Sequence, residues 1–229
     1  MRAQMLLTVS MIEFRHEKMM RYKQHGFSLL EVAIVMVILG LLFGLTLKGQ
    51  ELVNNSRVKS LADDFKSIQV ALYGYQDRFR ALPGDDRRAS SHLPDAGSPV
   101  LNGNGDEIIN GNWSSRSGES FNLWQHIRLA GFIQGTADMG QDSYVPLNSS
   151  GGALGISEMT ASPIDGLKGN FIICSDNITG KLVKQLDLAM DDGNTAGGAM
   201  RIAPASIGGD GITTNDIDES GFYLTCLGT

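Results

Sequence analysis

The sequence contains few of the residues on which enzymes and metal proteins usually rely. Among 229 residues there are four histidines, two cysteines and two tryptophans, and beyond residue 26 the histidines are His92 and His126. Neither belongs to an H-E-x-x-H pair, and the chain has no G-x-S-x-G elbow and no phosphate-binding loop. We therefore predict no enzymatic activity and expect His126 to be a buried or half-buried structural residue.

Positive charge is also scarce. The chain has 19 Lys and Arg against 25 Asp and Glu, a formal charge of −6. Without residues 1–26, 14 basic residues remain against 23 acidic ones, a formal charge of −9. Because sequence-independent nucleic-acid binding relies on basic patches that contact phosphates, this composition gives it no support.

One long hydrophobic run is present, and it contains a single charge. Phe27 to Leu47 are 21 residues with no charged side chain except Glu31. As a helix they extend about 30 Å, enough to cross a bilayer. A carboxylate within the hydrocarbon region costs about 2.5–3.5 kcal/mol and usually meets a partner. We therefore expect a transmembrane helix in which Glu31 has a specific role.

The residues around this boundary resemble the type IV prepilin family, which includes pilins, minor pilins and the pseudopilins of type II secretion. A basic leader ends in Gly26, followed by Phe27, three small or aliphatic residues and Glu31. The resemblance implies that a prepilin peptidase cleaves between Gly26 and Phe27 and methylates the new amine of Phe27. It also implies that Glu31 pairs with the N-terminal amine of a neighbouring subunit during assembly.

Residues 1–26 are predicted to be a leader rather than a folded segment, because the long apolar run follows Gly26 instead of preceding it. Arg21 and Lys23 keep the leader side cytoplasmic, so the C-terminal bulk is expected in the periplasm. Translation is predicted to start at Met19 or Met20, which gives a leader of the short length common in this family.

The function implied is that of a structural subunit in a type IV pilus or pseudopilus. Its partners would be the prepilin peptidase, other subunits and an inner-membrane assembly platform. The subunit would lie in the inner membrane first, then in a periplasmic pseudopilus or cell-surface pilus. The alternative is an ordinary signal anchor, in which Glu31 is merely tolerated, on a periplasmic ligand-binding or calcium-binding protein or adhesin that does not polymerise.

The helix is expected to continue beyond the membrane as an amphipathic segment over residues 48–82. Pro83 disfavours helical geometry in Leu82, which predicts the end of the helix there. The apolar stripe follows spacings of three and four residues through Val58, Leu61, Phe65, Ile68, Leu72, Tyr75 and Phe79. A coiled-coil seam has similar spacing, but the flanking charges do not pair regularly, which favours packing against a head.

Residues 83–229 are rich in Gly, Asn, Asp and Ser and are predicted to form one turn-rich head of the α+β class with antiparallel strands. Helices are expected at about residues 120–130 and 181–191. The predicted strands cover residues 170–174, 200–203 and 222–227. The segments at 81–86, 123–133 and 186–193 also resemble stretches of large-headed prepilin-like proteins.

Cys174 and Cys226 both lie on the expected periplasmic side and each sits in a short apolar run. In an oxidising compartment we expect them to form a disulfide between neighbouring strands. A C-terminal disulfide is also frequent in type IV pilins. Two free thiols are the alternative, whereas metal binding would require more ligands than this pair supplies.

One segment has a pattern typical of ligand binding. Asn102, Asn104 and Asp106 alternate with glycines as in the first half of a calcium loop, and Glu107 follows. The second half is missing, since Trp113 stands where an EF-hand needs glutamate. The two readings are a looser calcium site and a polar turn. No other cofactor is predicted.

A second group of acids, Asp187, Asp191 and Asp192, lies near the end of the predicted second head helix. The first two are four residues apart, on one face of that helix. A cation site and a helix terminus are the two readings. The negative sign is unfavourable near a helix C-terminus, so termination alone explains these acids poorly.

Overall fold

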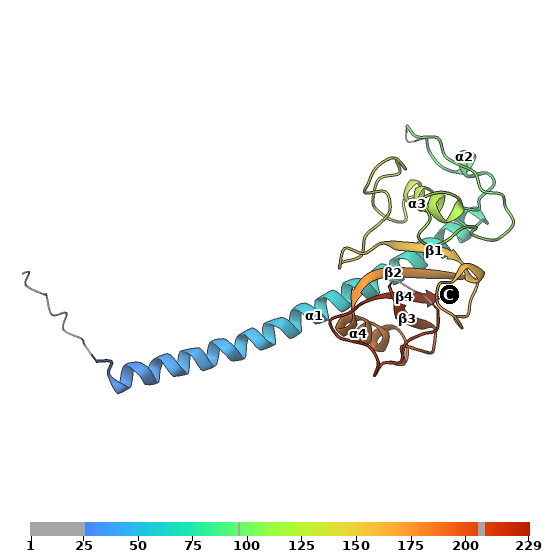
Figure 1. Ribbon diagram of the computed structural model, residues 1–229. Helices are drawn as coiled ribbons and strands as arrows, with labels where there is room; N and C mark the ends of the chain where they lie inside the picture. Colours follow the sequence, from blue (N-terminus) through green and yellow to red (C-terminus); the bar gives the residue numbers. More distant parts are fainter. Residues whose placement is uncertain (1–25, 96, 206–208) are drawn as a thin grey trace, which may run out of the picture. The chain divides into compact units, whose positions relative to one another are not determined.

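The computed structural model describes residues 26–95, 97–205 and 209–229 (Figure 1). The chain divides after Leu47 into two compact units, to both of which helix α1, Leu29–Phe79, contributes.

The first unit contains the apolar part of α1. Ser28 lies at its start, where its hydroxyl accepts the N–H of Leu30 at 3.2 Å and its carbonyl accepts that of Glu31 at 3.0 Å. Every side chain from Phe27 to Leu47 is exposed. The most apolar 18-residue window of α1 has a mean hydropathy of 2.5, so the helix is long and apolar enough to cross a membrane.

In the second unit, α1 is striped as predicted. Val58, Leu61, Phe65, Ile68, Leu72 and Tyr75 are buried, and Phe79 packs against this core at its edge. The helix ends at Phe79 and not at Leu82, so the predicted end is wrong by three residues. Arg80 takes a left-handed conformation with φ 54° while its N–H still bonds the carbonyl of Gln76, which stops the helix before Pro83 has any influence.

A four-stranded antiparallel sheet forms the centre of the second unit. Its strands are β1 (Leu154–Glu158), β2 (Phe171–Thr179), β3 (Met200–Pro204) and β4 (Phe222–Gly228). Their order is β1-β2-β4-β3, which places β2 and β4 in the middle (Figure 1). The predicted strands correspond to β2, β3 and β4, and the α+β class is confirmed, whereas β1 was not predicted.

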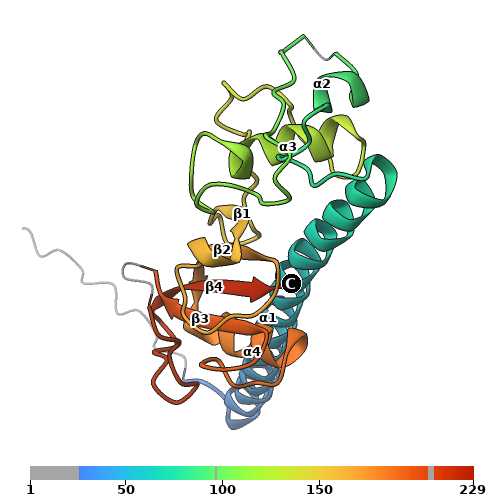
Figure 2. The same ribbon diagram turned by 90° about the vertical axis from the view of Figure 1, so that its right-hand side faces the viewer.

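The sheet has two different faces because successive side chains point to opposite sides. One face, with Ile173, Ile202 and Leu227, joins the main core with residues of α1 and of α4, Gly180–Met190. Figure 2 shows α1 passing behind the strands. On the other face, Cys174 and Cys226 stand directly opposite each other in β2 and β4 and are joined by the predicted disulfide.

Both edge strands are covered by loops of the same chain. At the β1 edge, the N–H groups of Leu154 and Glu158 donate to the carbonyls of Pro146 and Ile109. At the β3 edge, Ile202 donates to the carbonyl of Thr195 and accepts from the N–H of Ile212. Loops of the same chain therefore form hydrogen bonds with both outer edges of the sheet, which is a common way of protecting edge strands in natural proteins.

The remaining elements are helices α2 (Ala89–His92) and α3 (Glu119–Leu129) and the 3₁₀ turn η1 (Met159–Ala161). The predicted head helices correspond to α3 and α4. Helix α3 is buried on all sides from Glu119 to Arg128. Its buried polar side chains need partners within the head, and these partners build much of the candidate site.

Candidate functional site

The N-terminal segment of the described chain is open and precedes the helix. Gly26, Phe27 and Ser28 are not helical, and the side chain of Phe27 is 81% exposed. A Cβ added at Gly26 would meet no atom within 4 Å. Glycine is therefore not needed here for the fold of this chain, so any requirement for it comes from what binds the segment. Glu31 follows in the first turn of α1.

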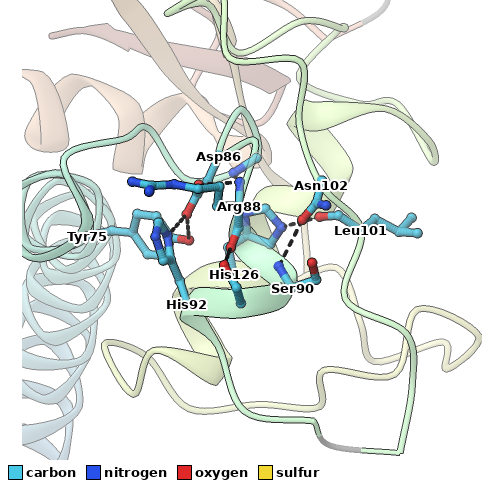
Figure 3. Close-up of polar contacts among 10 residues, drawn as sticks. Tyr75, Asp86, Arg88, Ser90, His92, Leu101, Asn102 and His126 are labelled. Atoms are coloured by element: carbon cyan, nitrogen blue, oxygen red, sulfur yellow. Dashed lines mark hydrogen bonds and ion pairs between the residues drawn. The ribbon is translucent and has the colours of Figure 1, made fainter.

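A buried polar network lies at the other end of α1 (Figure 3). Asp86, 2% exposed, accepts the hydroxyl of Tyr75 at 2.8 Å and the N–H of Arg88 at 2.9 Å, and Nδ1 of His92 lies 2.6 Å from its Oδ2. Burial alone would raise the pKa of Asp86, but the hydrogen bonds from Arg88, His92 and Tyr75 outweigh it and lower the pKa. Burial and Asp86 together raise the pKa of Tyr75.

His126 of α3 forms the second part of this network. Its Nδ1 accepts the N–H of Gly84 at 2.8 Å, and its Nε2 lies 2.7 Å from the carbonyl of Leu101 (Figure 3). Because Nδ1 accepts, the proton is on Nε2 and the ring is neutral. Burial lowers the pKa of His126, which favours the same state. His126 is fully buried, as predicted, and it joins two loop segments instead of facing a cavity.

A cluster of three carboxylates lies beside this network. Oxygens of Asp85, Asp106 and Glu119 all lie within 4.8 Å of one another. Asp85 and Glu119 are buried, at 3% and 8% exposure, whereas Asp106 is exposed. Carboxylate oxygens are ligands that Ca²⁺ prefers, so the cluster can hold a metal.

The same carboxylates also organise the loop around them. Asp85 accepts the N–H groups of Gly105, Asp106 and Glu107 at 2.5, 3.1 and 2.8 Å. Glu119 accepts the N–H of Asn104 at 2.8 Å and that of Asn110 at 3.0 Å. Burial, with the charge of Glu119, raises the pKa of Asp85 although these donors oppose it. These hydrogen bonds hold the loop together, but they do not neutralise the negative charge of the carboxylates in the cluster.

The structure brings together only part of the predicted calcium set. Asp106 belongs to the cluster, and Asn104 touches it by donating from Nδ2 to Asp106 at 2.9 Å. The side-chain oxygen of Asn102 instead accepts the N–H of Ser90 at 2.8 Å. The exposed Glu107 contributes its backbone N–H and adopts a left-handed φ of 68°, the conformation that the sixth loop position requires.

Sequence reasoning missed Asp85 and Glu119. Asp85 follows the Pro83–Gly84 turn about 20 residues before the loop, and Glu119 begins α3. The adjacent acids at 85 and 86 and the Gly-Glu start of the helix were the available signals. Neither signal indicates that the two acids meet across the loop.

Comparison with known families matches residues 21–47 to the prokaryotic N-terminal methylation motif. This match covers the basic residues before Gly26, the open segment and the apolar part of α1. The match supports a type IV prepilin-like protein. No curated protein and no solved structure matches the chain.

The open segment and the apolar part of α1 carry the motif, and they fit membrane anchoring. Residues 1–25 of the predicted leader, with the predicted start at Met19 or Met20, lie outside the described residues. The head lies beyond the matched motif.

Proposed function

We propose that the protein is a structural subunit of a type IV pilus or pseudopilus, assembled from the inner membrane. The observation that carries the proposal is the N-terminal methylation motif at residues 21–47. Within it, Glu31 lies in the first turn of α1 and is the charged residue of the otherwise uncharged, membrane-length run from Phe27 to Leu47. The head would then lie in the periplasm and later on the filament surface.

The proposed maturation begins with hydrolysis of the Gly26–Phe27 peptide bond by a prepilin peptidase. Water adds across the amide, so Gly26 gains a carboxylate and Phe27 gains a free amine. The same enzyme then transfers a methyl group to this amine from a sulfonium methyl donor, which leaves as the thioether while the amine releases a proton. The open conformation of Gly26 and Phe27 supports access by a peptidase. Processing removes the basic leader from the apolar helix.

Assembly would depend on Glu31 and the new amine of Phe27. A lone carboxylate in the hydrocarbon region costs about 2.5–3.5 kcal/mol, and a cation at the same depth offsets this cost. The amine of a neighbouring subunit would be such a cation, because cleavage creates it four residues from the carboxylate in the sequence. The exposed apolar side chains from Phe27 to Leu47 would pack against other subunits or lipid.

The first test is intact mass and N-terminal sequencing of the full chain from membranes of cells that express a prepilin peptidase. The expected product begins with N-methyl-Phe27. Gly26→Ala is the matched variant, because a Cβ at Gly26 meets nothing within 4 Å and should leave the fold intact. If the wild type keeps residues before Gly26, or if Gly26→Ala is cleaved equally well, the proposed maturation is wrong.

A second candidate function is that of a membrane-anchored calcium-binding protein or adhesin that does not polymerise. The carboxylates of Asp85, Asp106 and Glu119 favour it, because their oxygens lie within 4.8 Å of one another. Calcium binding that is lost in Glu119→Gln, combined with an uncleaved N-terminus, would support this function over the filament subunit. Calcium binding with cleavage would instead place a calcium-stabilised head on a filament subunit.

A further inference from the structure

The loop around the carboxylate cluster contains every Asn-Gly pair of the chain, at residues 102–103, 104–105 and 110–111. In such a pair, the backbone nitrogen of the glycine can attack the side-chain carbonyl carbon of the asparagine, because no Cβ of the glycine hinders the approach. The attack forms a five-membered succinimide ring and releases ammonia. The structure gives the three pairs different surroundings, and only one of them is built for this reaction.

The attacking nitrogen of the Asn104–Gly105 pair faces a carboxylate. The N–H of Gly105 donates to Oδ1 of Asp85 at 2.5 Å. Asp85 is 3% exposed, so water has little access to its carboxylate. A carboxylate within hydrogen-bonding reach of the proton to be removed has the geometry of a general base. Asp85 is therefore placed to take the proton of Gly105 as the nitrogen attacks.

The carbonyl group under attack is also held and polarised. Oδ1 of Asn104 accepts the N–H of Asp106 at 2.8 Å, a donor that stabilises negative charge on this oxygen as an oxyanion hole does. Nδ2 of Asn104 donates to Oδ2 of Asp106 at 2.9 Å, which fixes the oxygen and nitrogen ends of the amide. Because both contacts are with the residue two positions on, the side chain lies along the peptide that contains the Gly105 nitrogen. Asn104 is exposed, so water can reach the product.

The other two pairs lack this combination. The N–H of Gly103 donates at 2.9 Å to the backbone carbonyl of Asp86, which is not a base. Nδ2 of Asn110 is held at 3.1 Å by two carboxylates of the cluster, whose charges oppose the build-up of negative charge on the neighbouring carbonyl. Within the described residues, the N–H of Gly111 donates to no carboxylate. Asn104 is therefore the asparagine that the fold activates.

We propose that Asn104 and Gly105 form a self-modification site, at which Asp85 promotes the conversion of Asn104 to aspartate or isoaspartate. Asp85 accepts the proton of the Gly105 nitrogen, and a bond forms between that nitrogen and Cγ of Asn104. The proton returns through solvent to Nδ2, the Cγ–Nδ2 bond breaks, and ammonia leaves. Water then opens the succinimide. Attack on the side-chain carbonyl carbon gives aspartate, and attack on the main-chain carbonyl carbon gives isoaspartate.

The product changes the loop in a defined way. Isoaspartate adds one methylene to the main chain between residues 104 and 105, which displaces the N–H groups of Gly105, Asp106 and Glu107 from Asp85. Aspartate and isoaspartate both add a carboxylate beside Asp106. The loop thus changes with the age of the molecule, whether or not the protein forms filaments.

The test is incubation of the full chain in detergent micelles with a chelator at neutral pH, both native and unfolded in guanidinium chloride. Peptide mapping by mass spectrometry, with isoaspartyl methyltransferase labelling, gives the conversion rate of each asparagine. Asn104 should convert about tenfold or more faster in the native chain than in the unfolded chain, the lower part of the range for a general base. Asn102 and Asn110 should convert more slowly in the native chain.

Asp85→Asn tests the base, because asparagine still offers an oxygen to the N–H of Gly105 but cannot take up its proton. In the native variant, Asn104 should convert about tenfold or more slowly than in the wild type. Glu107→Gln, a change of an exposed acid in the same loop, is the matched control and should convert like the wild type.

If Asp85→Asn does not fold, the comparison of native and unfolded wild type still decides. The proposal is overturned if Asn104 converts no faster in the native wild type than in the unfolded chain. It is equally overturned if native Asp85→Asn converts Asn104 as fast as Glu107→Gln does.

Discussion

The hydroxyl of Tyr75 donates a hydrogen bond of 2.8 Å to the carboxylate of Asp86, and this contact joins α1 to the turn that follows it. Both residues are buried, with Tyr75 fully so. His92 and the N–H of Arg88 complete the set of donors around Asp86. The hydrogen bond between Tyr75 and Asp86 therefore stabilises the junction between the C-terminal end of α1 and the loop that follows it.

Tyr75→Phe should lower the free energy of unfolding by about 1–3 kcal/mol, because it leaves the buried Asp86 with one donor fewer. Tyr73→Phe is the matched control on the same helix, since the hydroxyl of Tyr73 makes an exposed contact of 3.0 Å with Thr229. That change should cost below about 0.5 kcal/mol. Urea denaturation of both variants measures the difference, and equal losses would contradict the role given to Asp86.

Gly84→Ala should destabilise the head by more than about 3 kcal/mol. Gly84 has a φ of 88°, and a Cβ there would collide with the backbone carbonyl of Glu119. Gly131 has a similar φ of 82° but open space around it. Gly131→Ala should therefore cost only the left-handed conformation, about 1–2 kcal/mol. Thermal unfolding of both variants measures the difference. If Gly84→Ala destabilises the head less than Gly131→Ala does, the close approach of Gly84 to the Glu119 carbonyl does not determine the cost.

Reduction of the disulfide should lower stability by about 4 kcal/mol, the loop-entropy value for a separation of 52 residues between Cys174 and Cys226. The measurement is denaturant unfolding with and without reductant. In a double variant with both cysteines replaced by alanine, reductant should have no effect. An unchanged midpoint of the reduced wild type would mean that β2 and β4 are held together without the covalent link.

Stability should fall as pH rises from about 4 to 7 in the presence of a chelator, owing to Asp187. Burial, followed by the charges of Asp191 and Asp192, raises its pKa in the folded protein from 3.8 to about 7, so in this interval the folded state binds more protons than the unfolded chain. The free energy of unfolding then decreases with pH and levels off above about 7. Asp187→Asn should flatten this slope, whereas Asp142→Asn, a change of an exposed acid on another loop, should leave it unchanged. Thermal unfolding across the range measures it.

Glu31→Ala should leave cleavage after Gly26 intact but reduce incorporation into filaments by about tenfold or more, since a lost intramembrane pair of about 1.4 kcal/mol already has that effect. Glu51→Ala is the control on the same helix, because Glu51 makes an exposed pair of 3.1 Å with Lys48. Quantitative blotting of sheared filaments against the membrane fraction checks both. Normal incorporation of Glu31→Ala would remove the proposed assembly contact.

The features predicted well from the sequence are those that depend on local pattern. The apolar helix, the stripe from Val58 to Tyr75, the strands β2 to β4 and the pairing of Cys174 with Cys226 all follow from spacing, β-propensity or the scarcity of cysteine. For the helix, the stripe and the strands, a residue's neighbours in the sequence determine its environment, whereas Cys174 and Cys226 lie 52 residues apart and were paired because the chain has two cysteines. These are the conditions under which periodicity is informative.

The features that were missed depend on contacts between distant segments. Strand β1, with Gly155 and Ser157 at its centre, is weakly β-forming by itself and is fixed by pairing with β2. Asp85 reaches Glu119 only because the loop between them folds back. Helix α3 buries its polar side chains as well as its apolar ones. No local pattern in these segments indicates which distant residues they meet.

The covered edges of the sheet affect whether strands of neighbouring heads can pair with one another. In a filament or a crowded periplasm, neighbouring heads are held at high local concentration, a condition under which open strand edges join between molecules. Leu154, Glu158 and Ile202 already share their backbone groups with loops of their own chain. Tight lateral packing of many copies would thus proceed through side chains alone, and each head would keep its own sheet.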